Sequence, residues 1–290
     1  MKAIIFGVSG QDGYYLSKLL EKENIKVIGV CPSGKNCIKG DVSNIKFVEN
    51  LIKKHKPEYI FHLAAISSTS HNFLFDNHKI ICMGSLNILE SSRIYCPNTK
   101  IFLSGSAMQF KNIGKPINEK VVFDASSAYS LARIHSTYAA RYYRDKFNMK
   151  IYIGYFFNHD SPLRTEQHIN KRIAESVKRI KNGSEEKIEI GDLKAKKEFN
   201  FAGDIVEAVW ILVNQEKKYE AVVGSGEAHS IEDFIKHCFS EINKNWRDYV
   251  IVKAGFASDY KILVSDPMLI KSIGWKPKTN FNQLVKMMLD

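Results

Sequence analysis

Gly7-Val8-Ser9-Gly10-Gln11-Asp12-Gly13 is the stretch that decides the fold, because it joins the first apolar run of the chain to its first segment of helical period. In such a GxxGxxG loop the glycines permit a tight turn, a close backbone approach to a pyrophosphate, and close contact between helix and strand. The N-terminus of the following helix attracts phosphate. The loop predicts a dinucleotide site, and a glycine-rich turn without a ligand is the alternative. The predicted cofactor contacts here are Gly7, Gly10, Gln11, Asp12 and Gly13.

The alternation that begins at this loop continues through the first half of the chain. Short runs rich in Val, Ile and Phe alternate with longer segments of helical period, which is the pattern of successive βα units and hence of a parallel sheet. Strands are predicted at 2–8, 26–30, 59–63, 100–104 and 150–156, and helices at 12–22, 44–56, 80–94 and 128–147. The sequence therefore predicts an α/β fold with a doubly wound parallel sheet of the Rossmann type.

The rhythm changes after Asn158, where segments of helical period are separated by several short strands. Helices are expected in 169–180, 202–213 and 230–241. We therefore predict a dinucleotide-binding domain at 1–157, and at 158–290 a smaller mixed α/β lobe that binds substrate and returns some segments to the first domain. No low-complexity linker separates the halves, so they should pack closely and form a cleft.

Composition and charge narrow the classes of function. The 290 residues are 44% hydrophobic and 25% charged, which is ordinary for a globular protein. The formal charge of +11 invites a nucleic-acid partner. However, the basic residues are scattered among acidic ones and form no recognised nucleic-acid module, so we expect no nucleic-acid partner.

The N-terminus, the apolar runs and the cysteines suggest a cytoplasmic protein without a membrane segment. The first apolar run is too short and too early for a signal peptide, and no run approaches membrane-spanning length. The five cysteines are odd in number and contain no CxxC pair. They predict neither a disulfide framework nor a metal site.

The end of the second predicted strand bears on the choice between NAD and NADP. An acidic residue there holds the free ribose hydroxyls of NAD, whereas a basic or small polar loop admits the additional phosphate of NADP. The segment from Val30 to Lys35 contains no acid, and Ser33 and Lys35 could meet a phosphate. The sequence therefore favours NADP, with NAD as the alternative. The alternative is an exposed turn whose lysine contacts only water, because it would have the same sequence pattern.

Two further strand ends lie on the same edge of the predicted sheet. Asp41 could accept from the adenine amino group, and Val42 follows it. Leu63, Ala64 and Ala65 end the third strand, where small side chains would let the backbone approach the cofactor. Taken alone, an Ala pair in this position is more often simple core packing.

A second group of residues suggests a reaction centre. Tyr129 and Arg133 lie one helical turn apart near the start of a predicted helix, and Ser106 follows the fourth strand. Together with the glycine loop, they form the serine, tyrosine and base arrangement of short-chain dehydrogenases. A phenol of pKa about 10 acts as an acid or base near neutrality only if a nearby cation lowers its pKa.

Five stretches along the chain carry a resemblance to a known family. They are residues 10–16, 156–162, 191–196, 226–230 and 274–277. With these segments in order, the chain resembles the GDP-mannose 4,6-dehydratases of the extended short-chain dehydrogenase/reductase superfamily over nearly its whole length. The resemblance implies an enzyme that acts on a nucleotide-linked sugar, possibly one carrying GDP.

The resemblance also implies roles for individual positions. Ser106 matches the family's catalytic Thr or Ser, and Tyr129 matches its acid/base. The implied cofactor contacts are Gly7, Gly10, Gly13, Asp41, Val42, Leu63, Tyr129, Arg133, His159 and Arg164, and the implied substrate contacts are Ser67, Met108, Asn158 and Lys197.

Three departures from the family pattern bear on the reaction. Met108 stands where the dehydratases have a Glu that handles a sugar proton and assists loss of the C6 hydroxyl, and a thioether has no transferable proton. Arg133 stands where the family has a Lys, and its planar fork occupies different space. The segment 255–260 lacks the arginine with which the family grips the substrate pyrophosphate.

These departures leave three functions open. The leading interpretation is NADP-dependent oxidation or reduction at C4 of a nucleotide sugar, which needs no acid at position 108. The second is a 4,6-dehydratase that recruits another acid, either Glu119 or one near Gln109. The third is a catalytically impaired homologue that binds nucleotide. In each case, the helices at 80–94 and 128–147 could form a homodimer interface, or could simply pack on their own sheet.

Overall fold

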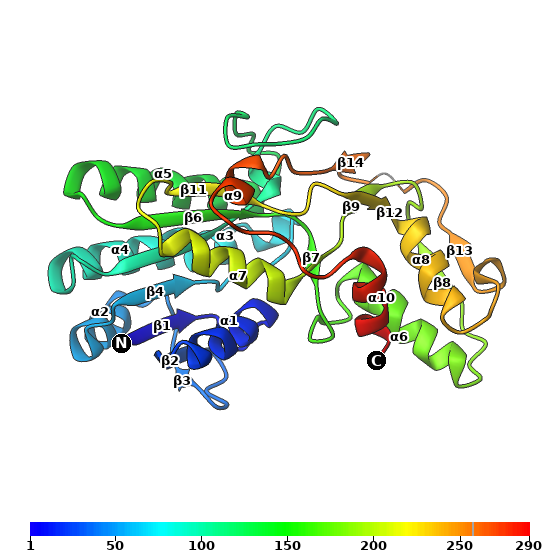
Figure 1. Ribbon diagram of the computed structural model, residues 1–290, viewed down its shortest axis with the longest axis horizontal. Coiled ribbons are helices and arrows are strands. Elements are labelled where there is room, and N and C mark those ends of the chain that lie inside the picture. Colours follow the sequence, from blue (N-terminus) through cyan, green and yellow to red (C-terminus); the bar gives the residue numbers. More distant parts are fainter. Residues whose placement is uncertain (257) are drawn as a thin grey trace.

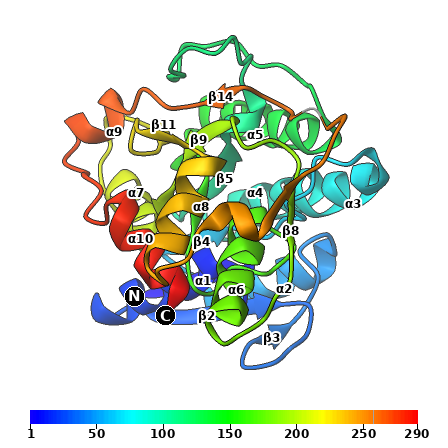
Figure 2. The same cartoon turned by 90° about the vertical axis from the view of Figure 1, so that its right-hand side faces the viewer.

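The computed structural model describes residues 1–256 and 258–290, so that position 257, within the segment 255–260, lies outside the described residues. The chain forms a layered α/β body, on the left in Figure 1, and a smaller lobe on the right that carries the last helix. Viewed along the long axis of the molecule, the lobe lies over one end of the larger body (Figure 2).

The larger body is built on a sheet of seven strands, and every pair of neighbouring strands in it is parallel. In spatial order the strands are β11 (Glu220–Val223), β6 (Ile151–Phe156), β5 (Lys100–Ser106), β4 (Tyr59–His62), β1 (Lys2–Phe6), β2 (Lys26–Cys31) and β3 (Ile38–Lys39). β1 lies near the middle, with β4 on one side and β2 on the other, so the order reverses at the glycine loop. This doubly wound arrangement confirms the predicted fold class.

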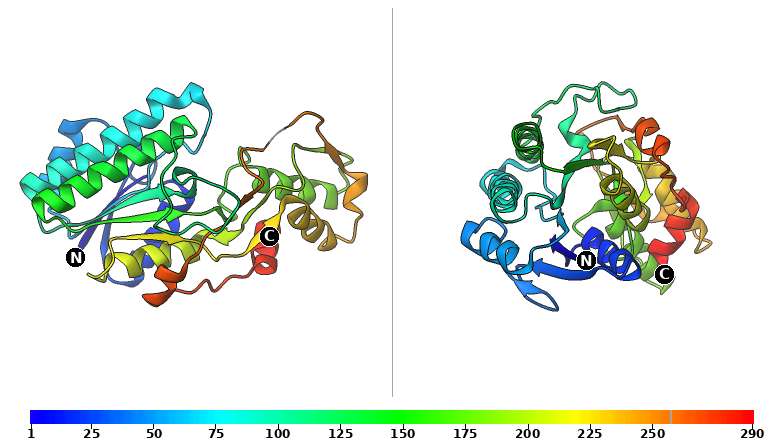
Figure 3. Two further views of the ribbon diagram at one scale, coloured as in Figure 1. Left: turned by 90° about the horizontal axis from the view of Figure 1, so that it is seen from above. Right: turned by 60° about the vertical axis from the view of Figure 1, so that its left-hand side comes forward.

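Helices cover both faces of this sheet because each has one apolar stripe to bury. The helices are α1 (Gln11–Lys22) and α7 (Ala202–Val213) on one face, and α2 (Ile45–His55), α4 (Gly84–Tyr95) and α5 (Ala128–Phe147) on the other. Figure 3 shows α4 and α5 side by side over the second face. Leu16 and Val209 are buried in the first layer, and Ile52 and Ile88 in the second.

The helix predicted at 80–94 is longer than the pattern indicated. α3 (Leu74–Asn77) runs into a π-helical turn at His78–Met83 (η2), and α4 continues from there. The wider turn inserts one residue into the helical repeat, so the apolar spacing in this segment does not match a 3.6-residue period. Short 3-10 turns also lie at His71–Phe73, Ala107–Gln109 and Trp246–Asp248.

The smaller lobe has its own apolar core, in which α6, α8 and α10 pack together. Its elements are α6 (Ile169–Lys181), β8 (Ile188–Ile190), β9 (Lys196–Glu198), β12 (Ala228–Ser230), α8 (Ile231–Ser240), β13 (Val250–Val252), β14 (Ile262–Leu263) and α10 (Phe281–Leu289). A short pair, β7 (His159–Asp160) and β10 (Asn200–Phe201), lies at the join between the two parts.

Three elements from the second half of the chain return to the larger body. α7 and β11 belong to its helical layer and sheet, and α9 (Met268–Ser272) packs against β11. Trp275, just after α9, is 1% exposed and donates its indole N–H to the Asp204 carbonyl at 2.9 Å. The division at residue 157 stays a prediction, because the chain crosses between the two parts more than once.

The prediction of no disulfide is wrong at one pair. Cys31, the last residue of β2, is bonded to Cys37, with 6.1 Å between their Cα atoms. Gly34 and Asn36 have φ angles of +72° and +57°, so the chain turns back and β3 pairs beside β2. Sequence spacing alone did not reveal this turn, which brings the two thiols together.

Among residues 1–256 and 258–290, no helix is long and apolar enough to cross a membrane.

Candidate active site and dinucleotide site

The glycine loop closes one side of a cavity of about 710 Å³ at the carboxyl ends of β1, β2 and β4. A volume of this size is typical of a site for a small molecule or cofactor. Predicted contacts that line it are Gly7, Gly10, Asp41, Val42, Leu63, Ala64 and Ala65. The structure therefore brings together residues that lie far apart in the sequence, as we expected from their positions at strand ends on one edge of the sheet.

Packing explains why glycine occupies the two ends of this loop. Gly7 has a φ of +91°, and a Cβ on it would lie 2.7 Å from the Ala64 backbone nitrogen. A Cβ on Gly13 would lie 2.4 Å from the Gly7 carbonyl oxygen. Any side chain at either position would push the loop away from β4 or from α1. These close approaches shape a cradle that fits the pyrophosphate of a dinucleotide.

The basic residue on the wall of this cavity is not the one predicted. Ser33 and Lys35 are exposed on the turn closed by the disulfide, and neither lines the cavity. Lys39, at the end of β3, lines it instead, and so does Lys79, whose Nζ lies 3.5 Å from Asp41. In the sequence, the position of Lys39 two residues before Asp41 was the one signal that could have indicated this lysine.

A partly buried ion pair fastens the glycine loop to the segment after β6. His159 Nε2 lies 3.0 Å from Asp12 Oδ1, and its Nδ1 lies 2.8 Å from the Phe157 carbonyl. Both ring nitrogens face acceptors, which requires the doubly protonated imidazolium. Burial alone would lower the pKa of His159, but the Asp12 carboxylate outweighs it and raises that pKa. Burial would likewise raise the pKa of Asp12, and the charge of His159 lowers it instead.

Gln11 supports the same connection from the first residue of α1. Its side-chain amide donates to the His159 carbonyl at 3.3 Å, and its side-chain oxygen accepts from the Ser161 hydroxyl at 2.9 Å. Gln11 is buried and does not line either cavity. Gln11 was predicted to contact the cofactor, but in the structure it holds the glycine loop in place.

A second cavity of about 250 Å³ adjoins the first, and both share Leu63 and Ala65. Its wall includes the carboxyl ends of β5 and β6 and residues from the segments that follow β4, β5 and β6. Predicted site residues on its wall are Asp12, Ser67, Ser106, Met108, Tyr129, Arg133, Asn158, His159 and Arg164. All three predicted catalytic residues thus meet in one place.

Ser106 is held at the end of β5 by its own 3-10 turn. Its backbone N–H donates to Gln109 Oε1 at 2.7 Å, and its hydroxyl oxygen accepts from the Met108 N–H at 3.2 Å. Gln109 is fully buried and donates to the Thr137 hydroxyl at 2.9 Å. The hydroxyl proton of Ser106 remains free to bind an oxygen in the cavity.

Tyr129 lies in the first turn of α5, which Ser127 caps by accepting from the Ser130 N–H at 3.1 Å. The Arg133 guanidinium carbon lies 5.1 Å from the centre of the Tyr129 ring. Arg133 is 5% exposed, and its Nη1 donates to the carbonyl oxygen and to the hydroxyl of Ser104, the latter at 2.8 Å. The Arg133 guanidinium is therefore held by Ser104 of β5, and its charge lies over the Tyr129 ring.

Three buried polar atoms around this cavity have no hydrogen-bond partner among the described residues. They are Arg133 Nε, Asn158 Oδ1 and Arg164 Nε. Buried donors and acceptors without partners cost free energy, so a polar ligand that satisfies them would be stabilised. This unsatisfied set, together with the glycine cradle, fits a dinucleotide and a polar substrate.

Sequence reasoning missed two aromatic residues on the wall. His168 Nδ1 lies 3.1 Å from Arg164 Nη2, and burial lowers the pKa of His168 to about 4, so a neutral ring accepts from the arginine. Tyr260 also lines this cavity, and burial raises its pKa to about 12. Neither residue lies in a motif, so only the folded structure reveals them.

Two residues considered from the sequence lie away from the cavity. Lys197 is buried but does not line it, and its Nζ lies 5.4 Å over the Phe199 ring. Burial lowers the pKa of Lys197. Glu119, considered as a substitute acid, accepts from the Val222 N–H at 2.7 Å and also lies outside the wall. The exposed carboxylate that does line the cavity belongs to Asp259.

Solved structures with the same architecture place this fold in one class. A UDP-glucose 4-epimerase from Thermotoga maritima matches with a TM-score of 0.89 at 21% identity, over 100% of this chain and 97% of that one. The protein RMD from Pseudomonas aeruginosa, solved with NADPH, matches with a TM-score of 0.88 at 16% identity, over 99% and 97%. Fold and relatives together define an enzyme of the nucleotide-sugar dehydratase and epimerase class.

Sequence comparison then gives the family. The GDP-mannose 4,6 dehydratase family profile matches residues 4–288, and the chain belongs to this family. GDP-mannose 4,6 dehydratase 2 of Arabidopsis thaliana is 30% identical over 99% of this chain and 86% of its own length. The human GDP-mannose 4,6 dehydratase is 24% identical over 99% and 90%. The resemblance noted in the sequence is confirmed.

Proposed function

We propose that this enzyme oxidises or reduces C4 of a nucleotide-linked hexose with NADP as its cofactor. The observation that carries the proposal is the composition of one cavity wall, where Ser106 and Tyr129 lie together with Met108. Proton exchange at a C4 oxygen needs the hydroxyl and the phenol. Elimination of water needs in addition an acid or base near C5 and C6, which a thioether does not provide.

Each side chain has a distinct task in this reaction. The Tyr129 phenol exchanges a proton with the C4 oxygen, and the free Ser106 hydroxyl donates a hydrogen bond that holds that oxygen. The Arg133 guanidinium, 5.1 Å from the centre of the Tyr129 ring, keeps a positive charge beside the reacting oxygen. A bound nicotinamide supplies or accepts the hydride at C4. Asn158 and Arg164, with unsatisfied polar atoms, bind hydroxyl or phosphate groups of the two ligands.

Two observations support NADP as the cofactor. The turn after β2 carries no acid that would favour a free ribose hydroxyl, and Lys39 lines the wall of the larger cavity beside that turn, whereas Lys79 is paired with Asp41. The structurally similar RMD was solved with NADPH. NAD remains the alternative, and the ratio of the two dissociation constants decides between them.

Dehydration at C4 to C6 is the second candidate, because the relatives with sequence similarity are GDP-mannose 4,6 dehydratases. It requires another acid. Of the two carboxylates on the wall, Asp12 is paired with His159, so we infer Asp259 for that role. Gln109 is committed to Ser106 and Thr137, and Glu119 lies elsewhere. Asp259→Asn would therefore abolish dehydration and leave oxidoreduction at C4 intact.

A binding protein without turnover is the third candidate. The observation that favours it is the anchoring of Arg133 on Ser104, because a fork held there has less freedom to reach a ribose hydroxyl. Arg133→Lys tests this point. A gain of turnover in that variant would mean that the wild-type protein is impaired, and equal turnover would mean that the arginine serves as well.

The first experiment incubates the purified protein with GDP-mannose and other sugar nucleotides, including 4-keto forms, and with NADP or NADPH. Absorbance of the reduced cofactor and product mass are followed together. Net cofactor turnover supports the proposal, and loss of one water with the cofactor recycled supports the dehydratase. Met108→Glu is then the diagnostic variant: appearance of a dehydrated product would link that position to the choice of reaction, and an unchanged product would refute the link.

A further inference from the structure

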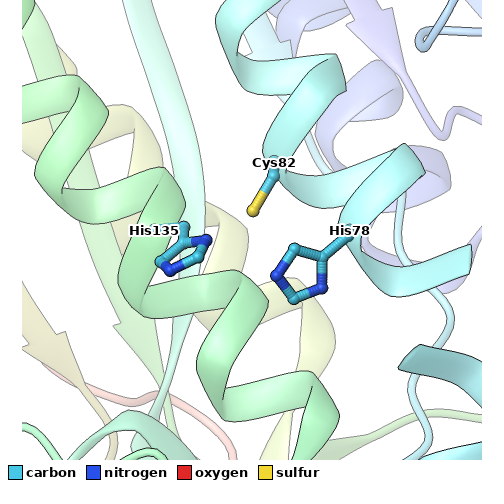
Figure 4. A group of neighbouring side chains, drawn as sticks. All are labelled: His78, Cys82 and His135. Carbon is cyan, nitrogen blue, oxygen red and sulfur yellow. The ribbon is translucent and has the colours of Figure 1, made fainter. Parts of the chain in front are cut away.

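A cluster of three potential metal ligands lies outside both cavities. His78 and Cys82 lie four residues apart on η2, and His135 faces them from α5 (Figure 4). One ligand atom from each residue lies within 4.8 Å of the other two. None of the three has a task in the reaction proposed above, and none lines either cavity.

The composition of this cluster suits a divalent transition metal ion. Imidazole nitrogen and thiolate sulfur are the ligands of Zn²⁺ and related borderline-soft ions, with bonds of about 2.0 to 2.3 Å in a tetrahedron. Such bonds place neighbouring ligand atoms roughly 3.5 Å apart. A spacing of up to 4.8 Å must therefore contract by about 1.3 Å at most, which rotation of the exposed His135 side chain can provide.

His78 is already oriented as metal-bound histidines are. Its Nδ1 lies 3.1 Å from the Leu74 carbonyl one turn earlier, so Nδ1 carries the proton and Nε2 keeps a free lone pair. The His78 and His135 rings meet edge to face, with centroids 5.2 Å apart. A backbone acceptor that fixes the tautomer is the outer-sphere partner that metal-bound histidines usually have.

Cys82 supplies the sulfur from the buried side of the cluster. Its thiol donates to the Ala132 carbonyl of α5 at 3.3 Å, and it is 8% exposed. Binding of a metal ion would replace that hydrogen bond and release the thiol proton to solvent, leaving a thiolate on the metal. His135 is exposed in the single chain, so the ion can enter from solvent before two copies meet through α5, and a water molecule can occupy its fourth position.

We propose that His78, Cys82 and His135 form a binding site for one Zn²⁺ or a similar divalent transition ion. The site joins η2 to α5 across the helical face of the sheet. Cys82 packs with Ala132 and the Tyr129 ring, so the bound ion would stiffen the start of the helix that carries Tyr129. The site is structural in character, and it does not depend on which reaction the enzyme catalyses.

The spacing of the ligands explains why the sequence did not reveal the site. A histidine and a cysteine four residues apart lie on one helical face, but this pairing is too common to indicate a metal. The third ligand comes from a helix more than fifty residues later, and only the packing of α5 against η2 brings it close. The absence of a CxxC pair therefore did not bear on this cluster.

Cobalt provides the direct test on the full-length protein after removal of metals with a chelator. Co²⁺ is added to the wild type, and the thiolate-to-cobalt charge-transfer absorption is followed to saturation. We expect one equivalent to bind, with loss of the charge-transfer band in Cys82→Ser and at least about tenfold weaker binding in His135→Ala. Because His135 is exposed, His135→Ala should keep the unfolding temperature of the metal-free protein, which separates ligand loss from misfolding.

Matched controls separate this site from other thiols and histidines. Cys96→Ser removes a partly buried thiol that belongs to no group of three potential ligands among the described residues, and His71→Ala removes an exposed histidine; both variants should bind Co²⁺ as the wild type does. Zn²⁺ should raise the unfolding temperature of the wild type and of both controls, but not of His135→Ala. Absence of saturable binding, or equal binding by His135→Ala and the wild type, would overturn the proposal.

Discussion

Single residues account for the chemistry that we assign to the smaller cavity. Tyr129 contributes the proton donor and acceptor, Ser106 a hydrogen bond, and Arg133 a positive charge held by Ser104. Sequence patterns predicted these three residues, because Ser106 ends a strand and Tyr129 and Arg133 lie one helical turn apart. His168, Tyr260 and Asp259 line the same cavity and lie in no such pattern.

Tyr129→Phe should reduce turnover by about 10² to 10⁴, the usual contribution of a positioned general acid or base. Nucleotide binding should stay within about twofold of the wild type, since the ring and its contact with Arg133 remain. Steady-state kinetics and calorimetric titration with NADP measure the two effects. Turnover equal to that of the wild type would remove Tyr129 from the reaction.

The ion pair of Asp12 and His159 predicts a pH dependence of stability. The folded pKa of His159 is raised, so its contribution to the free energy of unfolding is fully present below about pH 6.5 and is lost as pH rises through the folded pKa. The folded pKa of Asp12 is lowered, so its contribution is present above about pH 3.9 and is lost as pH falls.

Urea unfolding of the wild type and of His159→Gln checks this sign. The stability difference between the two proteins should be larger at about pH 6 than at about pH 9. Asp12→Asn serves as the matched control, because it removes the other partner and should show the same trend. A difference that is constant or grows with pH would contradict the assignment of a charged imidazole.

At the scale of elements, the start of α5 positions the reaction centre. Ser127 caps this helix in a reciprocal pair with Ser130, and Tyr129 follows in the first turn. Fraying of that turn would move the phenol relative to Ser106. Helix capping therefore affects both stability and turnover at this position.

Ser127→Ala should lower the free energy of unfolding by about 1 kcal/mol and reduce kcat several-fold. The matched control is Asn280→Ala, which removes a capping box of the same kind from α10 in the smaller lobe. It should destabilise the protein similarly and leave kcat unchanged. Equal loss of kcat in both variants would mean that the effect on turnover follows from general destabilisation.

At the scale of the whole molecule, the outer face of α4 and α5 bears on assembly. Exposed apolar side chains on this side of the protein are Met83, Leu86, Ile94, Tyr138 and Tyr142. Exposed apolar side chains on neighbouring helices are typical of a protein interface, and two copies can meet through the same face about a twofold axis. We therefore expect a homodimer in which α4 and α5 of each copy form a four-helix bundle.

Tyr142→Glu should shift the protein toward the monomer, because it places a charge in the expected interface. Light scattering after size-exclusion chromatography measures the mass, and Ile113→Glu, an exposed apolar position on the loop after β5, is the control. A wild-type protein that is monomeric at micromolar concentration, or a dimer that Tyr142→Glu leaves intact, would contradict this interface.

The sequence by itself determined the parallel sheet, the glycine loop, the helix that begins before Tyr129, and the family. These features depend on local periodicity and on motifs whose residues are close neighbours in the chain. The tertiary structure alone decided the Cys31–Cys37 disulfide, the place of Lys39 rather than Lys35 on the cavity wall, and the position of Asp259. The sequence predicted that some later segments return to the larger body, but only the structure showed that these are α7, β11 and α9, because long-range packing, which no local pattern records, fixes where a segment lies.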